Sequence, residues 1–199
     1  MRIIAGKYRG RKLKSPRALQ TRPTSDRLRE TLFNILAPRI EGARFLDLCA
    51  GTGAVGIEAL SRGASHVTFV DQSRKMSALI KETCDALAID EDKFELVTAD
   101  ASDFLRPYAK KSNQPFDMIF FDPPYAMDYS LLSHVGERGA LLANEGLLIV
   151  EHYKKKHLAE EFRGLRRFRQ VKQGDSVLSF YEWTAERSAK SHEPTRNST

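Results

Sequence analysis

The chain has 199 residues, of which 41% are hydrophobic and 29% are charged, and this composition is typical of one soluble globular domain. A chain of this length can bury a sizeable core without help from disulfides or metal ions. Its basic start has no apolar segment of the kind a signal peptide needs, and no apolar run approaches membrane-spanning length, so secreted and membrane classes are not expected.

The positive charge is concentrated in two blocks. The formal net charge is +6, and residues 1–22 carry eight basic and no acidic side chains. Residues 152–172 form a second block of about +6, whereas the long stretch between the blocks is mildly acidic. Basic blocks of this kind suit a phosphate backbone, although a solvated surface with incidental lysines is the alternative. The distribution favours nucleic acid as the partner.

Residues 1–13 predict a small basic hairpin. Two short extended pieces flank Gly6 and Gly10, and Tyr8 lies among arginine and lysine side chains. Basic side chains beside an aromatic ring can contact phosphates while the ring stacks on a base. The segment is therefore a candidate nucleic-acid contact.

An amphipathic helix follows an irregular basic stretch. Ser25 or Thr24 is suited to cap its start, and apolar residues at positions 28, 32, 35 and 36 have helical spacing. Arg27, Arg29 and Glu30 lie off this apolar stripe. For each of these three residues there are two interpretations of equal weight: a charge on the solvated surface of the helix, or a contact with the substrate.

From residue 44 onward, apolar strands alternate with amphipathic helices. This order predicts an α/β fold with a parallel sheet covered on both faces. A Gly-Asp pair at 174–175, between two apolar-alternating runs, predicts a terminal antiparallel hairpin. The polar tail from residue 184 is expected to be disordered. The expected strands are 44–49, 67–70, 94–98, 116–121, 146–150, 168–172 and 177–183. The first expected helix of this region follows the glycine-rich segment and ends at residue 61. Further helices are expected at 74–87, 103–108 and 131–142, and a short one is expected after residue 156.

The two cysteines, Cys49 and Cys84, have neither metal-ligand spacing nor the arrangement of a secreted disulfide framework. We therefore expect a reducing, cytoplasmic environment and no metal ion.

A glycine-rich loop follows the first strand of the alternating region. Residues 51–56 read Gly-Thr-Gly-Ala-Val-Gly, which matches the G-x-G-x-x-G pattern, and Asp71 follows about 20 residues after the loop. This spacing fits the ribose-binding acid of a dinucleotide site. An NAD-dependent dehydrogenase is therefore one interpretation.

Three further features favour S-adenosylmethionine over NAD. Asp47 precedes the loop, where a carboxylate could balance a sulfonium ligand that also carries an amino acid. Asp100 ends the third strand, where it could accept a hydrogen bond from an adenine amino group with the Ala101 N–H nearby. No hydride-transfer partner is evident. Taken singly, Asp47 and Asp100 could instead cap a helix or turn.

The fourth strand ends at Asp122, Pro123, Pro124 and Tyr125. Proline cannot donate to a strand ladder, so the two prolines end the strand and stiffen the loop. The Asp122 carboxylate and the Pro123 carbonyl would accept the N–H bonds of an exocyclic amine and free its lone pair. Tyr125 would stack on the base. A rigid turn without catalytic role is the alternative.

These motifs together carry a family resemblance. The sequence resembles the bacterial RsmD-type methyltransferases in segments 2–10 (RIIAGKYRG), 21–24 (TRPT), 29–36 (RETLFNIL) and 47–63, and in Asp-Pro-Pro-Tyr. Cys49 and Thr52 stand where Phe and Ser are expected in many members. The resemblance extends to about residue 183. It implies N2-methylation of guanine 966 in 16S rRNA, a seven-stranded sheet with an antiparallel end, and an N-terminal extension that docks on the small subunit or its assembly intermediate.

The expected domains are a basic extension (1–42), a class I S-adenosylmethionine-dependent methyltransferase domain (43–183) and a tail (184–199), acting as a monomer without membrane contact. Adenine-N6 methylation and a non-catalytic assembly factor remain alternatives.

The site residues fall into three groups. The expected donor-binding residues are Asp47, Ala50, Gly51, Gly53, Asp71, Gln72, Asp100 and Ala101. The expected RNA-binding residues are Arg2, Lys7, Arg9, Arg11, Lys12, Arg22 and Arg27, and the expected catalytic residues are Asp122, Pro123, Pro124 and Tyr125.

Overall fold

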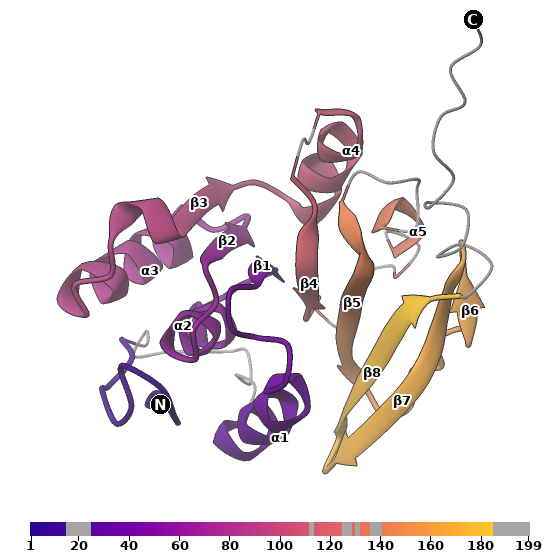
Figure 1. Cartoon of the computed structure of the whole chain (residues 1–199), viewed down its shortest axis with the longest axis horizontal. Helices are drawn as coiled ribbons and strands as arrows, with labels where there is room; N and C mark the ends of the chain where they lie inside the picture. Colours follow the sequence, from indigo (N-terminus) through magenta and orange to yellow (C-terminus); the bar gives the residue numbers. More distant parts are fainter. Residues whose placement is uncertain (15–24, 112–113, 125–128, 130–131, 136–140, 185–199) are drawn as a thin grey trace, which may run out of the picture.

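A computed structural model describes residues 1–14, 25–111, 114–124, 129, 132–135 and 141–184. These residues form one eight-stranded sheet, drawn in Figure 1. Its strands are β1 (Arg44–Leu48), β2 (His66–Asp71), β3 (Phe94–Thr98), β4 (Phe116–Phe121), β5 (Leu142–Tyr153), β6 (Glu161–Phe162), β7 (Leu165–Gln173) and β8 (Ser176–Trp183). The helical segments are α1 (Asp26–Leu36), α2 (Ala54–Ser61), α3 (Arg74–Ala86), η1 (Glu91–Lys93), α4 (Ala101–Lys111) and α5 (Leu132–Val135).

The strand order is β3-β2-β1-β4-β5-β8-β7-β6. The first five strands of the chain pair in parallel, and β8, β7 and β6 continue the sheet with antiparallel pairing. The predicted parallel sheet with a terminal hairpin is confirmed. Since the order reverses between β1 and β4, the carboxyl ends of these two strands flank the crevice where open α/β sheets bind ligands.

The segment before β7 differs from its prediction. In the described part of the chain the sheet has eight strands rather than the expected seven, because β6 pairs with β7 where a short helix was expected. The turn between them consists of Arg163 and Gly164, which both have positive φ, 50° and 84°. Such a two-residue turn matches the twist of a hairpin and rules out a continuing helix.

The fifth strand and the helix before it also differ from the prediction. Strand β5 begins at Leu142 rather than Gly146, and α5 is only four residues long. Residues 136–140, which the prediction placed in this helix, lie outside the described chain.

Two apolar cores cover the two faces of the sheet. On one face, Met118 and Phe120 of β4 pack with Leu32 of α1 and Ile57 of α2. On the other face, the alternate residues of β4 pack with α4 and α5. The strand therefore is buried on both sides, as its continuous apolar run predicted. None of the helices in the described residues is long and apolar enough to cross a membrane.

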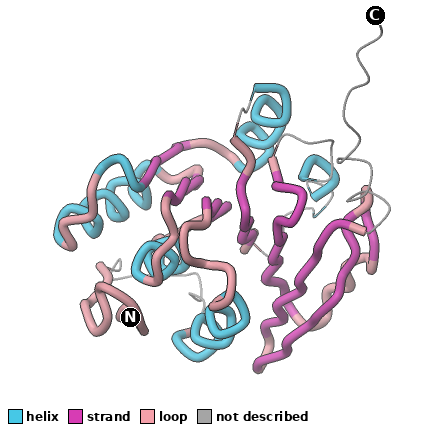
Figure 2. The backbone as a smooth tube through the Cα atoms, in the orientation of Figure 1, coloured by secondary structure: helices cyan, strands magenta, loops and turns pink. Residues whose placement is uncertain are grey.

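The N-terminal segment lies against α2, as the loop beside that helix in Figure 2 shows. It forms a single antiparallel bridge, between Arg2 and Lys12, so the predicted hairpin is present in minimal form. Ile3 is buried in the core. A Cβ on Gly6, whose φ is +80°, would lie 1.8 Å from the Ser61 carbonyl oxygen. Only glycine allows this close approach. Whether 1–42 is a separate unit stays a prediction, but its first residues pack directly on the sheet domain.

Helix α1 begins as predicted. Ser25 is its N-cap, and the serine hydroxyl accepts a hydrogen bond from the Leu28 N–H at 3.2 Å. Arg29 departs from both interpretations of its sequence position, since its side chain is neither solvated nor at a substrate surface but fully buried. Its guanidinium donates to the Arg2 carbonyl and to Asp26. Arg29 therefore ties the N-terminal segment to α1.

Candidate active site

Four aspartates meet at the carboxyl edge of the sheet. Neighbouring strands β3, β2, β1 and β4 place Asp100, Asp71, Asp47 and Asp122 side by side at this edge. They line a cavity of about 590 Å³. A cavity walled by carboxylates suits a ligand with positive charge. The other predicted residues that line it are Ala50, Gly51, Gln72, Ala101, Pro123 and Pro124.

The glycine loop owes its composition to backbone geometry and close packing. Gly51 and Gly53 have positive φ, 55° and 72°. A Cβ on Gly56 would lie 2.2 Å from the Phe69 ring, so the third glycine lets α2 pack on β2. Gly53 does not line the cavity; a Cβ there would lie 2.8 Å from Ile80. Its assignment to donor binding stays a prediction, and its close packing on Ile80 shows that it also shapes the loop from behind.

Asp71 and Asp100 are partly held by the backbone next to them. The Asp71 carboxylate accepts hydrogen bonds from the Gly51 and Ser73 N–H groups, each at 2.8 Å. One Asp100 oxygen accepts from both the N–H and the hydroxyl of Ser102, and these bonds lower the pKa of Asp100. Asp100 therefore caps the start of α4 and also lines the cavity; its contact with an adenine amino group stays a prediction.

Asp47 is 2% exposed and accepts a hydrogen bond from the Gly56 N–H at 2.8 Å. Its pKa is raised from 3.8 to about 7, mainly by burial and to a smaller extent by the charge of Asp71, while the Gly56 hydrogen bond opposes the shift. Retaining a carboxylate in such a position is typical of functional sites.

We expect Asp47→Asn to stabilise the ligand-free protein at pH 8. Between pH 3.8 and about 7 the unfolded chain releases the Asp47 proton before the folded protein does, so stability falls as pH rises through this window. A shift of this size corresponds to roughly 4 kcal/mol as an upper bound. Asparagine keeps an acceptor for Gly56 and removes this cost. Denaturant unfolding at several pH values should show a gain at pH 8 that shrinks toward pH 4; a constant difference would contradict this explanation.

Asp122 is a second buried acid with a raised pKa that faces the cavity. Its pKa is raised well above 3.8, first by burial, then by the charges of Glu151 and Asp47. Its carboxylate accepts no hydrogen bond from the described residues, while its N–H donates to the Leu48 carbonyl at 3.4 Å. The acid is thus held through its backbone with its side chain available to a ligand. Tyr125, the expected stacking residue, lies outside the described residues.

The thiol of Cys49 also lines the cavity. Burial, with a smaller contribution from the neighbouring aspartates, raises its pKa strongly. The group is therefore a protonated thiol and not a nucleophile.

The predicted RNA-binding side chains are exposed wherever the structure describes them. These are Arg2, Lys7, Arg9, Arg11, Lys12 and Arg27; Arg22 lies outside the described residues. Tyr8 differs from its prediction, because its ring packs partly buried against the core and Lys7 Nζ lies 5.2 Å from the ring centroid. The hairpin therefore contributes charge, whereas its aromatic ring serves mainly to anchor it.

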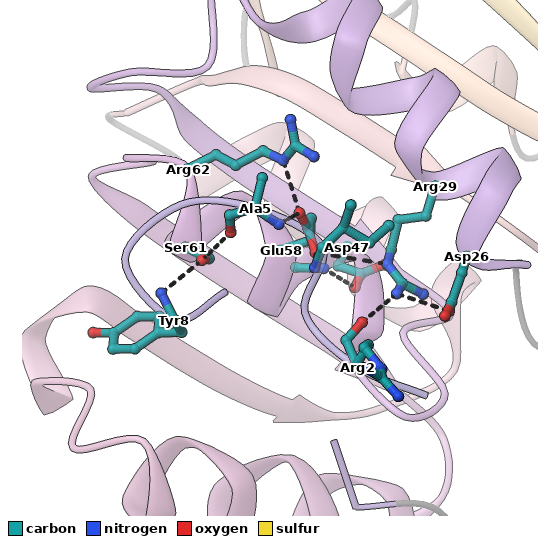
Figure 3. Close-up of polar contacts among 11 residues, drawn as sticks. Arg2, Ala5, Tyr8, Asp26, Arg29, Asp47, Glu58, Ser61 and Arg62 are labelled. Carbon is teal, nitrogen blue, oxygen red and sulfur yellow. Dashed lines mark hydrogen bonds and ion pairs between the residues drawn. The ribbon is translucent and has the colours of Figure 1, made fainter. Parts of the chain in front are cut away.

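A buried ionic cluster beneath the hairpin, shown in Figure 3, was not predicted from the sequence. Glu58 is fully buried and accepts hydrogen bonds from the Ile4 and Ala5 N–H groups, at 2.8 and 3.0 Å. Arg62 Nε donates to it at 2.8 Å, and Arg29 Nε lies 3.8 Å away. One signal for this cluster was present in the sequence. Glu58 is the only acid in α2, whose other residues are apolar or small, and an acid in such a helix indicates a buried ionic partner.

Several residues that line the cavity were also missed. Glu151 follows the fifth predicted strand as an acid at a strand end, so the reasoning used for the other aspartates could have found it. Others come from the start of α1, from α3 and from the terminal hairpin, which only the folded arrangement brings together: Ser25, Leu28, Met76, Gln173 and Ser176.

Known proteins resemble this chain over most of its length. A family model described as "Conserved hypothetical protein 95" matches residues 1–182. The chain is similar to "Ribosomal RNA small subunit methyltransferase D" of Haemophilus influenzae, with 39% identity over 79% of this chain and 81% of that protein. Its counterpart in Escherichia coli K12 is 43% identical over 76% of this chain and 74% of that protein.

Solved structures agree with this relationship. The yhhF protein of Escherichia coli superposes with a TM-score of 0.80 at 35% identity, covering 93% of this chain and 98% of the other. A hypothetical protein of Thermus thermophilus gives 0.77 at 31% identity, covering 92% and 99%. A parallel sheet that reverses order beside β1 and closes with an antiparallel hairpin is the fold of the class I S-adenosylmethionine-dependent methyltransferases.

Within that class, the match across residues 1–182 and the close relatives show the family. The chain belongs to the "Conserved hypothetical protein 95" family, the RsmD family of methyltransferases. The resemblance drawn from the sequence motifs is confirmed.

Proposed function

We propose that this protein transfers a methyl group from S-adenosylmethionine to N2 of guanine 966 in 16S rRNA. The observation that carries the proposal is the corner at Asp122 and Pro123, where a carboxylate with a raised pKa faces an acid-lined cavity. The relatives named for ribosomal RNA small-subunit methylation support the choice of RNA.

The residues present fit the methyl donor. S-adenosylmethionine supplies a methyl group on a sulfonium, an excellent leaving group, and it also carries an ammonium. Asp47, at the back of the cavity, would face the charged amino-acid end. Asp71 keeps lone pairs for the ribose hydroxyls, and Asp100 has a second oxygen for the adenine amino group beside the Ala101 N–H. Gly51 brings the loop backbone close to the ligand.

The Asp-Pro-Pro corner would activate the amine. The lone pair of an exocyclic amine is delocalised into the base, so acceptors directed at its N–H bonds favour the pyramidal form that can attack. The Asp122 carboxylate and the Pro123 carbonyl supply two acceptors, and neither proline has a competing N–H. A raised pKa also suits Asp122 to receive the proton that the amine loses after methylation. Positioning and electrostatics would supply most of the rate.

The exposed cations of the N-terminal segment would bind phosphates. The hydrogen bonds from the Ile4 and Ala5 N–H groups to Glu58 of α2 support this role, because they hold the segment in place while its cations face outward. A paired target base would have to leave its helix to reach Asp122, because the amino group of a stacked and paired base is not accessible to the acceptor. Guanine N2 rather than adenine N6 is favoured by the family, since the corner itself selects only an amino group.

Mass spectrometry tests the proposal directly. Small subunits from cells that lack the protein are incubated with the purified chain and S-adenosylmethionine carrying a labelled methyl group. We expect label in N2-methylguanosine. Label in N6-methyladenosine would instead support the adenine alternative, and tight RNA binding without any transfer would support an assembly factor. Calorimetric binding of NAD but not of S-adenosylmethionine would revive a dehydrogenase.

A further inference from the structure

Strand β7 carries an aromatic side chain, Phe168, that is largely outside the hydrophobic core. Phe168 is 48% exposed, and it is the only large hydrophobic residue so exposed in the described part of the chain. It lies at an irregularity in the pairing of β7 with β8, between Arg167 and Arg169. Its ring leans on the buried Phe180, with centroids 6.2 Å apart and a tilt of 56°. The ring is therefore packed against one buried neighbour while about half of the side chain remains exposed.

The strand around this ring is strongly basic. Residues 165–173 contain four basic side chains and no acid. Arg167 is engaged by the Leu158 carbonyl and by Glu160. Arg169 and Lys172 are exposed, and neither forms an ion pair with a described residue. Charges on a strand near a sheet edge can serve merely to prevent aggregation, but an exposed phenylalanine works against that purpose.

The face that carries Phe168 leads to the active-site cavity. Arg169 lies opposite Phe180, Val171 opposite Leu178, and Gln173 opposite Ser176, so these three residues of β7 share one face. Phe168 is the extra residue of the bulge, and its contact with Phe180 places its ring on this face as well. Gln173 and Ser176 line the cavity at the end of the hairpin. The stretch of strand from Phe168 to Gln173 spans about 17 Å, which several stacked nucleotides could follow.

The same cavity has α1 as its other wall. Ser25 and Leu28 line it from α1, while the hairpin lines it from β7 and β8. Figure 1 shows the β7–β8 turn and α1 at the same end of the molecule. The exposed Arg27 lies on α1 between these two lining residues. Exposed cations therefore lie on both elements that wall the cavity, Arg27 on α1 and Arg169 on β7. The second of these belongs to the basic block 152–172, from which the sequence named no individual RNA-binding residue.

We propose that the β7 face is a second RNA-binding surface, on which an unpaired base flanking the target stacks on Phe168 while Arg169 holds the adjoining phosphate. Lys172, which projects from the opposite face of the strand, is left out of this assignment. The inference rests on the proposed function only in taking RNA as the substrate. Stacking on an aromatic ring tolerates any base, so this surface would position the strand and leave base choice to the cavity.

The test compares Phe168→Ala, Phe168→Trp and Arg169→Gln with the control Lys93→Gln, which removes an exposed cation in η1 beside the opposite sheet edge. Protein-free 16S rRNA from cells lacking the protein is the probe, and both its dissociation constant and its KM are measured. We expect Phe168→Ala to weaken RNA binding and to raise KM about tenfold. Phe168→Trp keeps an aromatic ring, so its dissociation constant and KM should stay close to the parental values. Arg169→Gln should lower the salt slope of binding by about one. S-adenosylmethionine affinity and Tm should stay unchanged in all variants.

Each other result has a defined meaning. Parent-like RNA binding and KM in Phe168→Ala and Arg169→Gln would overturn this inference while leaving the methyltransferase proposal intact. A defect seen only with assembled small subunits would assign the surface to a ribosomal protein instead, and a change in sedimentation would assign it to self-association; either overturns the RNA assignment. Failure of the parent chain to bind or methylate any rRNA would overturn the proposed function itself.

Discussion

Asp122→Asn is expected to lower the rate of methyl transfer by about 10²- to 10³-fold while S-adenosylmethionine still binds with nearly parental affinity. Asparagine can accept one hydrogen bond from the amine but cannot take its proton, and it has no charge to support the pyramidal form. Asp122→Ala removes both acceptor oxygens and should abolish turnover. Single-turnover transfer to RNA, with calorimetry for the donor, measures the two properties separately.

The pH profile gives this prediction a second readout. The carboxylate form of Asp122 is the active form, and burial together with Glu151 and Asp47 raises its pKa. The rate of the parent protein should therefore rise with pH through the raised pKa of Asp122 and then level off. The small residual rate of Asp122→Asn should lack this rise. A positively charged donor stabilises the carboxylate, so the apparent pKa in kcat should lie below that in kcat/KM.

Asp117→Asn provides a matched control on the same strand. Asp117 is exposed at the opposite end of β4, where it accepts a hydrogen bond from the Arg44 N–H at 2.8 Å. Asparagine keeps that acceptor, so turnover and its pH profile should not change. If Asp122→Asn lost donor affinity to the same extent as turnover, Asp122 would be a structural residue of the cavity and not the acceptor for the amine.

Much of this site follows from local rules that operate within one strand and the loop after it. A continuous apolar run predicts a buried strand, and an acid at its end must lie at the carboxyl edge of a parallel sheet. Asp71, Asp100 and Asp122 were found in this way. Glu151 obeys the same rule at the end of the fifth predicted strand.

Contacts between distant segments could not be obtained from those rules. Helical periodicity places Arg29 off the apolar stripe of α1, because the stripe marks only the face that meets the sheet. The face with Arg29 is covered by residues 1–14, which come from outside the alternating pattern. Tyr8 is partly buried for the same reason. Gln173 and Ser176 reach the cavity because the antiparallel hairpin returns its turn to the carboxyl edge of β5.

The N-terminal segment therefore depends on a charge cluster that only the folded chain assembles. Glu58 accepts the Ile4 and Ala5 N–H groups, and the fully buried Arg29 donates to the Arg2 carbonyl. The contacts that hold the basic segment are thus made by its backbone groups. Its exposed cationic side chains remain available to bind phosphates. Fixing the backbone in advance reduces the entropy that must be lost when RNA binds.

Glu58→Gln is expected to destabilise the protein by about 3–5 kcal/mol, since it removes the buried carboxylate that faces Arg29 and Arg62. Among the described residues, the fully buried Arg29 would then keep an ion pair only with Asp26, whose side chain is 56% exposed. Two Arg29 nitrogens, Nε and Nη1, already lack hydrogen-bond partners among the described residues. The variant should also release the N-terminal segment, because the amide offers one acceptor where two backbone N–H groups and Arg62 now bind a carboxylate. Denaturant unfolding and hydrogen exchange at Ile4 and Ala5 measure the two effects.

A compensating variant separates charge from packing. The double substitution Glu58→Leu with Arg29→Met removes both members of the buried pair at similar volume, and it should recover part of the lost stability. It cannot restore the acceptors for Ile4 and Ala5, so rRNA affinity should remain low while S-adenosylmethionine affinity stays at the parental level. Glu91→Gln, at a side chain that is 83% exposed, should change neither property. Parental rRNA affinity in the double variant would show that RNA binding does not require the anchored segment.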